Sequence, residues 1–162
     1  MNLTPRTAIL ALILGASSLS FAYASLASEA AHQHGASTHE LQLNAGEKWA
    51  TDAPLRKAMG ALNGAMQTSL PAIHDNQLGD AQYDQLAARI NDEVTYMVKH
   101  CKLAPEADAQ LHLVIAELLA GADSMAGKTP GEARRNGAVK VLGALQTYAK
   151  YFADTSFDTI EH

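Results

Sequence analysis

Apolar residues recur at spacings of three and four along four segments of the chain. Such a repeat places hydrophobic side chains along one face of an α-helix. Short polar connections separate the segments, and this arrangement predicts an all-α fold, an up-down-up-down antiparallel four-helix bundle. The four predicted faces are Leu55, Met59, Leu62, Met66, Ser69 and Ile73; Tyr83, Leu86, Ile90, Val94, Met97 and Cys101; Leu111, Ile115, Leu118, Ala122 and Met125; and Arg135, Ala138, Leu142, Leu145, Ala149 and Phe152.

Residues that favour helix starts precede three of these segments. Thr51 or Asp52 is a suitable cap for the first helix, with Pro54 in its first turn, where a missing N–H is tolerated. Pro105 marks the start of the third helix in the same way. The run Thr129-Pro130-Gly131-Glu132 has the spacing of a capping box, which predicts that the fourth helix begins there.

The first 24 residues have the pattern of a secretory signal peptide. One positive charge in residues 1–6 precedes an uncharged apolar stretch over 7–21, and Ala22-Tyr23-Ala24 offers a cleavage site flanked by small residues. We therefore expect cleavage after residue 24 and export of the mature chain to a bacterial periplasm. An uncleaved membrane anchor is the alternative, because the apolar stretch approaches the length that spans a bilayer.

Residues 25–45 are small, polar and aperiodic, and we expect a mobile leader. His32, His34 and His39 lie within it, and a histidine cluster of this kind either binds metal weakly or is a solvated tail. The bundle is then expected over residues 46–162.

Charge and cysteine content narrow the classes of function. With 12 basic and 17 acidic residues, the chain has a net charge of −5, which gives no electrostatic basis for binding nucleic acid or an anionic membrane. Cys101 is the only cysteine, so in an oxidising compartment it is unpaired, bound to a ligand, or cross-linked between two chains in a homodimer. No catalytic motif is present in the sequence, and we do not expect an enzyme.

Four potential metal ligands are predicted to meet at one end of the bundle. Met97 and Cys101 lie one turn apart on the second helix, and residues with this spacing share a face. In the predicted topology Met59 and His112 reach the same layer from neighbouring helices, whereas His100 is rotated away from it. Thiolate, thioether and imidazole are the ligands that copper favours. The alternative is that Cys101 and the methionines are ordinary core residues.

Three short stretches of the sequence also resemble stretches in the periplasmic soluble b-type cytochromes. Met59, seven residues after Asp52, resembles that family's axial methionine, and Pro105-Glu106 followed by His112 resembles its third helix. The resemblance implies an electron-transfer bundle with haem b near one end. However, Ala149 stands where the family has its second axial ligand, a histidine in a Tyr-His-x-Lys-Tyr pattern. Without a Cys-x-x-Cys-His motif, covalent haem attachment as in the related cytochromes c-prime is excluded.

Three functions remain open from the sequence. The first is a copper-binding bundle for copper trafficking or electron transfer, with Cys101, His112, Met59 and Met97 as ligands. The second is a haem b bundle with Met59 and His112 as the axial pair. The third is a metal-free bundle that is structural or binds a partner protein.

Overall fold

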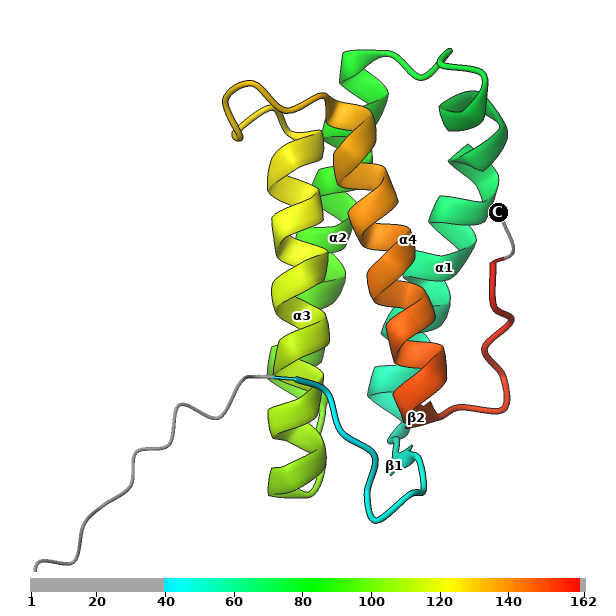
Figure 1. Cartoon of the computed structure of the whole chain (residues 1–162), viewed down its shortest axis with the longest axis vertical. Coiled ribbons are helices and arrows are strands. Elements are labelled where there is room, and N and C mark those ends of the chain that lie inside the picture. The colour runs from blue at the N-terminus through cyan, green and yellow to red at the C-terminus, as the bar shows by residue number, and fades with distance from the viewer. Residues whose placement is uncertain (1–39, 161–162) are drawn as a thin grey trace, which may run out of the picture. The chain divides into compact units, whose positions relative to one another are not determined.

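The computed structural model describes residues 40–160, and these form four helices packed around one core (Figure 1). The helices are α1 (Ala53–His74), α2 (Asp80–His100), α3 (Pro105–Met125) and α4 (Arg134–Tyr151). Two short strands, β1 (Trp49–Ala50) and β2 (Phe152–Ala153), flank the set. The prediction of an all-α helical bundle is confirmed. The predicted signal peptide and the three leader histidines lie outside the described residues.

Hydrogen bonds between segments distant in sequence show which helix ends lie together. The Asp52 carboxylate accepts the Lys102 N–H at 2.6 Å, which joins the start of α1 to the end of α2. At the opposite end the Arg135 guanidinium donates to the Ile73 carbonyl at 3.2 Å, which joins the end of α1 to the start of α4. In Figure 1 the chain runs up α1, down α2, up α3 and down α4. No helix within residues 40–160 is both long and apolar enough to cross a membrane.

Two of the predicted helix starts are confirmed. Asp52 is the N-cap of α1, and its carboxylate accepts the Leu55 N–H at 2.8 Å. This bond satisfies one of the backbone donors that the first turn of a helix leaves unpaired. Pro105 is the first residue of α3, where its fixed φ suits the helix and its lack of an N–H costs nothing.

The predicted start of α4 is wrong by several residues. Residues 129–132 form a turn, and α4 begins only at Arg134 after Ala133 as N-cap. Gly131 adopts a φ of +78°, which a right-handed helix does not accommodate. The Glu132 carboxylate, expected to cap the helix, instead accepts hydrogen bonds from the Ser124 hydroxyl at 2.9 Å and the Lys140 ammonium at 3.0 Å.

Helices α3 and α4 touch through two glycines. A Cβ atom added to Gly137 would lie 2.5 Å from the Gly121 carbonyl oxygen and 2.6 Å from the Met125 nitrogen. The two helix backbones therefore lie so close together that only glycine, which has no side chain, fits at these two positions. By contrast, a Cβ added to Gly60 in α1 or to Gly143 in α4 would meet no atom within 4 Å.

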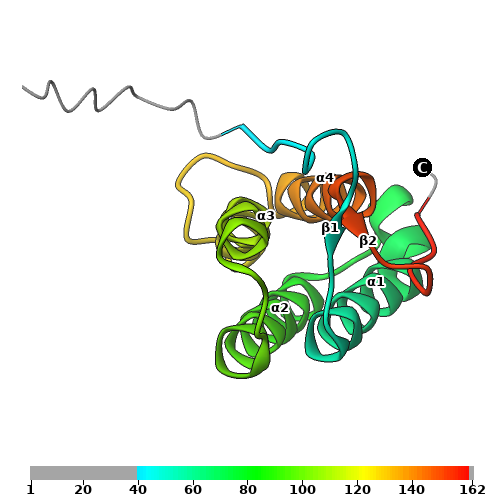
Figure 2. The same cartoon turned by 90° about the horizontal axis from the view of Figure 1, so that it is seen from below.

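The two strands form a parallel pair that connects the segment before α1 to the segment after α4. Trp49 pairs with Phe152 and Ala50 with Ala153. The Thr51 hydroxyl adds a hydrogen bond of 2.8 Å to the Ala153 carbonyl. Figure 2 shows β1 and β2 crossing the end of the bundle beside α1 and α4. We call this pair the clasp.

After the clasp, the chain turns at residues 155–156, and residues 154–160 then continue beside α1 and α4 (Figure 1). We call this segment the strap. The Asn63 side-chain amide donates to the Asp158 carbonyl at 2.7 Å, and the Phe157 ring packs edge-on against Tyr148 with centroids 5.1 Å apart. Ile160 is buried in the main hydrophobic cluster. Side chains of two helices thus hold the strap in place.

Candidate metal site between α2 and α3

A small hollow between α2 and α3 brings together three of the four predicted metal ligands. It has a volume of about 250 Å³. The residues that line it are Met97, Val98 and Cys101 from α2 and its C-cap, and Asp108, Leu111, His112 and Ile115 from α3. A thioether, a thiol and an imidazole therefore border one space.

The fourth predicted ligand, Met59, does not line this hollow. Its side chain is fully buried on α1 within the hydrophobic cluster that fills the bundle. Met97 is also almost fully buried, at 1% exposure, yet it borders the hollow. The two methionines therefore differ in placement, since only Met97 combines burial in the core with access to the space beside Cys101.

Cys101 is the C-cap of α2, and its backbone N–H closes the last turn on the Met97 carbonyl at 2.9 Å. The side chain is half-buried. Burial raises the pKa of the thiol to about 12, assisted by the charge of the Asp52 carboxylate, by a hydrogen bond to that carboxylate, and by the charge of Asp108. The sulfur is thus a protonated thiol at neutral pH, and a protonated thiol is a poor nucleophile and a poor ligand.

His112 is more exposed than Met97 and Cys101, with a side chain 63% accessible. Its Nδ1 lies 2.8 Å from the Asp108 carbonyl oxygen and 3.5 Å from the Asp108 carboxylate. A carbonyl oxygen only accepts hydrogen bonds, so Nδ1 carries the proton and Nε2 of the neutral ring keeps its lone pair. Metal-binding histidines are commonly oriented by a hydrogen bond of this kind from the nitrogen that does not bind the metal.

Among residues 40–160, no group of three or more His, Cys, Asp or Glu side chains is close enough to hold a metal ion. The candidate ligands therefore reduce to the Cys101 sulfur, the His112 Nε2 and the Met97 thioether. Soft sulfur ligands of this type select Cu(I) over harder cations.

The sequence located the ligand-type residues but missed the two carboxylates beside them. Asp108 lies one helical turn before His112, a spacing that indicates contact on a helix. Asp52 was predicted only as a helix cap. Its approach to Cys101 follows from the meeting of α1 and α2 at one end of the bundle, and no local pattern in the sequence indicates it.

On α4 the buried residue near Cys101 is Tyr148, whereas the sequence predicted that Ala149 faces the site. Tyr148 is fully buried and Ala149 is only half-buried. Burial raises the pKa of Tyr148, its hydrogen bond to Asp154 raises it further, and Cys101 contributes to the same shift, which places the tyrosine near the thiol. The prediction that His100 points outward is confirmed, since its side chain is exposed. Its ring lies against the Tyr96 ring with centroids 4.5 Å apart and the two planes tilted by 38°.

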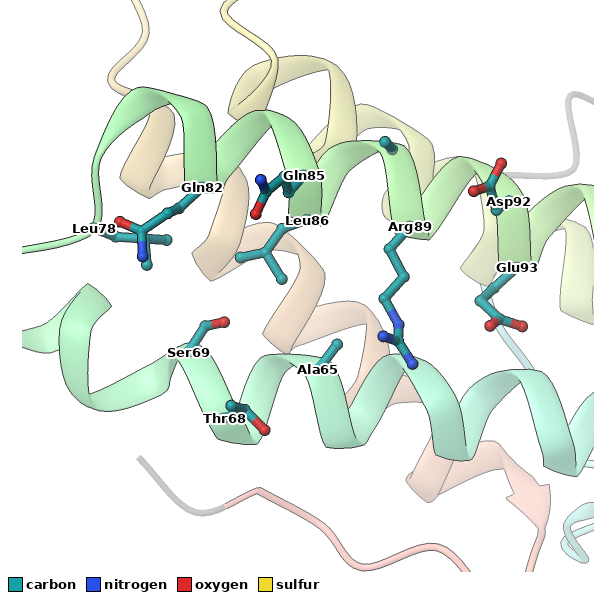
Figure 3. Close-up of a pocket in the computed structure, with 11 residues that line it drawn as sticks. Ala65, Thr68, Ser69, Leu78, Gln82, Gln85, Leu86, Arg89, Asp92 and Glu93 are labelled. Atoms are coloured by element: carbon teal, nitrogen blue, oxygen red, sulfur yellow. The ribbon is translucent and has the colours of Figure 1, made fainter.

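A second and larger hollow runs between α1 and α2 (Figure 3). Its volume is about 600 Å³. Ala65, Thr68 and Ser69 line it from α1, opposite polar side chains of α2, and Figure 3 shows Arg89 extending from α2 toward α1. None of its lining residues is a cysteine, histidine or methionine. This hollow is therefore chemically distinct from the one beside Cys101.

No protein-family profile, curated protein or solved structure matches this chain.

Proposed function

We propose that this protein is a copper-binding helical bundle that carries Cu(I) in the hollow between α2 and α3. The single observation that supports the proposal is that Met97, Cys101 and His112 border one hollow. The proposed ligands are the Cys101 thiolate and the His112 Nε2, with the Met97 thioether as the weaker third ligand. Carriage of the ion fits this set better than electron transfer, because soft sulfur ligands favour the reduced ion.

Binding must be coupled to release of a proton. The raised pKa of Cys101 means that the thiol is protonated in the metal-free protein at neutral pH, whereas copper binds the thiolate. The affinity for Cu(I) should therefore increase with pH up to about 12. The negative charges of Asp52 and Asp108, which disfavour the free thiolate, attract the cation that replaces the proton.

We propose copper rather than haem b because Met59 and His112, the two residues that would be the axial ligands of a haem, are placed apart. Met59 is fully buried on α1, whereas the His112 side chain is 63% exposed on α3 and borders a hollow that Met59 does not line. Axial ligation by this pair requires the bundle to rearrange. Ala149 offers no ligand in the place of the second histidine.

The experiment that tests the proposal is a Cu(I) titration against a chromophoric competing chelator under anaerobic, reducing conditions. Cys101→Ser and His112→Ala should each remove most of the affinity, and Met97→Leu should weaken it more mildly. His100→Ala is the matched control, because it removes an exposed imidazole one residue from Cys101 and should leave the affinity unchanged.

Thermal unfolding at each Cu(I) concentration measures the same binding in a second way, through the stability of the folded state. A ligand at 100 times its dissociation constant stabilises the folded state by about 2.7 kcal/mol, and this gain should vanish in Cys101→Ser. Replacement of His32, His34 and His39 by alanine separates any binding by the leader histidines from binding by the bundle. Equal Cu(I) affinity in the wild type and Cys101→Ser would exclude the site.

A further inference from the structure

The hollow between α1 and α2 has room for a small molecule because α1 contributes only short side chains to it. Ala65, Thr68 and Ser69 line it from α1, whereas α2 contributes longer side chains such as Gln82 and Arg89 (Figure 3). Its volume is about 600 Å³, within the range of about 300–1,000 Å³ that is usual for small-molecule sites. We call this space the α1–α2 hollow.

Apolar side chains line the middle of the α1–α2 hollow. Leu86 is buried at 9% exposure, and Ala65 on the opposite helix is half-buried. Figure 3 shows Leu86 between Gln82 and Arg89 along α2. A hydrocarbon segment placed against Leu86 and Ala65 would be removed from water, which favours binding.

On either side of this apolar stretch, α2 offers hydrogen-bond donors. The Gln82 Oε1 accepts the Gly79 N–H at 2.9 Å, so the carboxamide is held in one orientation and its Nε2 keeps two N–H groups for a ligand. Within residues 40–160 the Arg89 guanidinium makes no hydrogen bond or ion pair. Figure 3 shows it extending from α2 toward α1.

The spacing of these two donors sets the length of a ligand that reaches both. Gln82 and Arg89 are seven residues apart, which is about 10 Å along a helix at 1.5 Å per residue. A guanidinium binds a carboxylate through paired, charge-assisted hydrogen bonds, whereas a carboxamide N–H suits a neutral oxygen. The ligand that fits therefore has a carboxylate at one end, a neutral acceptor at the other and an apolar chain between them.

We propose that the α1–α2 hollow binds a medium-chain carboxylic acid with a hydroxyl or carbonyl oxygen at the far end of its chain. The carboxylate pairs with Arg89, the methylene chain covers Leu86, and the far oxygen accepts a hydrogen bond from Gln82 Nε2. None of these residues borders the hollow beside Cys101, so the inference does not rest on copper binding.

Glu93 distinguishes this ligand from a zwitterion such as an amino acid. It lines the hollow one helical turn after Arg89, and Figure 3 places it on the side of Arg89 away from Leu86 and Gln82. Its negative charge repels the carboxylate of the proposed ligand, whereas it would attract the ammonium group of an amino acid. The sequence of charges thus gives opposite expectations for the two ligand classes.

The test is isothermal titration calorimetry of the full chain with ω-hydroxyoctanoate as the probe. Octanediol, which has a hydroxyl in place of the carboxylate, should bind at least about tenfold more weakly, because it cannot form the charge-assisted pair with Arg89. Octanoate, which lacks the far oxygen, should bind with an intermediate affinity. Octanediol that binds as tightly as the probe, or no binding of the probe at millimolar concentration, would overturn the proposal.

Three substitutions on α2 locate the site. Arg89→Gln should weaken binding of ω-hydroxyoctanoate at least about tenfold, and Glu93→Gln should strengthen it by removing the repulsion. Lys99→Gln is the matched control, because it removes an exposed positive charge from the same helix outside the hollow, and it should leave the affinity unchanged. Equal affinity in the wild type and Arg89→Gln would exclude this site, and weaker binding in Glu93→Gln would indicate a zwitterion site instead.

Discussion

The Asp52 carboxylate accepts hydrogen bonds from three groups at the end of the bundle where α1 begins. One oxygen accepts the Leu55 N–H at 2.8 Å and the other accepts the Lys102 N–H at 2.6 Å. The same carboxylate accepts a hydrogen bond from the Cys101 thiol and raises its pKa. A single side chain therefore caps α1, ties it to the end of α2 and adds to the effect of burial on the pKa of the cysteine.

Asp52→Asn should make Cys101 more reactive. The substitution keeps a good N-cap residue but removes the negative charge that disfavours the thiolate. The pKa of Cys101 should fall toward 9.0, its ordinary value, although burial, the larger cause, keeps it raised. The rate of alkylation by iodoacetamide, measured as a function of pH, should then rise at lower pH than in the wild type.

Asp108→Asn is the control for this prediction. Its charge is the smallest of the causes that raise the pKa of Cys101, so the alkylation profile should shift less than in Asp52→Asn. An unchanged profile in Asp52→Asn would show that burial alone sets the reactivity of the thiol.

At the scale of elements, the glycine contact between α3 and α4 is the tightest packing constraint. Gly137→Ala should lower the free energy of unfolding by about 1–3 kcal/mol, because the added methyl group requires two backbones to move apart. Its Cβ would meet the Gly121 oxygen at 2.5 Å, and that atom belongs to the main chain. Urea unfolding followed by circular dichroism measures the change.

Gly60→Ala is the matched substitution in an open helix position. No atom lies within 4 Å of the added Cβ, so the higher helix propensity of alanine should stabilise the protein by up to about 1 kcal/mol. Opposite signs for the two variants are expected. If both stabilise the protein, the close contact of α3 and α4 is not a constraint.

The helices themselves could be predicted because their apolar faces repeat with the helical period. The failures have identifiable causes. Thr129 to Glu132 matched a capping box, but the positive φ of Gly131 stops a helix there and Lys140 draws the Glu132 carboxylate away. On α4 the expected face included Ala149, whereas Tyr148 is the residue that the packing buries.

The sequence also allowed only part of the candidate site to be predicted. Spacing along α2 placed Met97 beside Cys101, and the hollow between α2 and α3 includes both together with His112. Met59 was assigned by its depth along α1, and depth alone does not tell which side of a helix faces the hollow. Likewise, the clasp consists of two residues on each strand, too few to give a period in the sequence.

At the scale of the whole molecule, the Glu132 carboxylate should contribute to the dependence of stability on pH in acid. Hydrogen bonds from Lys140 and Ser124 lower the pKa of Glu132 below 4.5, its ordinary value. A lowered pKa in the folded state stabilises that state above the pKa of the unfolded chain, and this contribution is lost as the pH falls through the folded value. Glu132→Gln should thus lower stability at neutral pH and flatten its dependence on pH below about 4.5.

Urea unfolding midpoints at neutral pH and in acid compare the variant with the wild type. Asp123→Asn is the control, because Asp123 pairs with Lys128 in the same connection and both side chains are more than half exposed. An exposed pair of this kind contributes little. If the two variants behave alike in acid, the partly buried hydrogen bond from Ser124 to Glu132 has no special role.

The clasp joins parts of the chain that are far apart in sequence. Thr51 bonds to Ala153 across 102 residues, and Lys48 bonds to the Ala149 carbonyl across 101. Closing a loop of that length in an unfolded chain costs about 4 kcal/mol of entropy, which two strands of two residues each do not recover. Helix pairs joined by short connections must therefore assemble first, and the clasp closes last. Hydrogen exchange followed during refolding should find its amides protected after those of the helices.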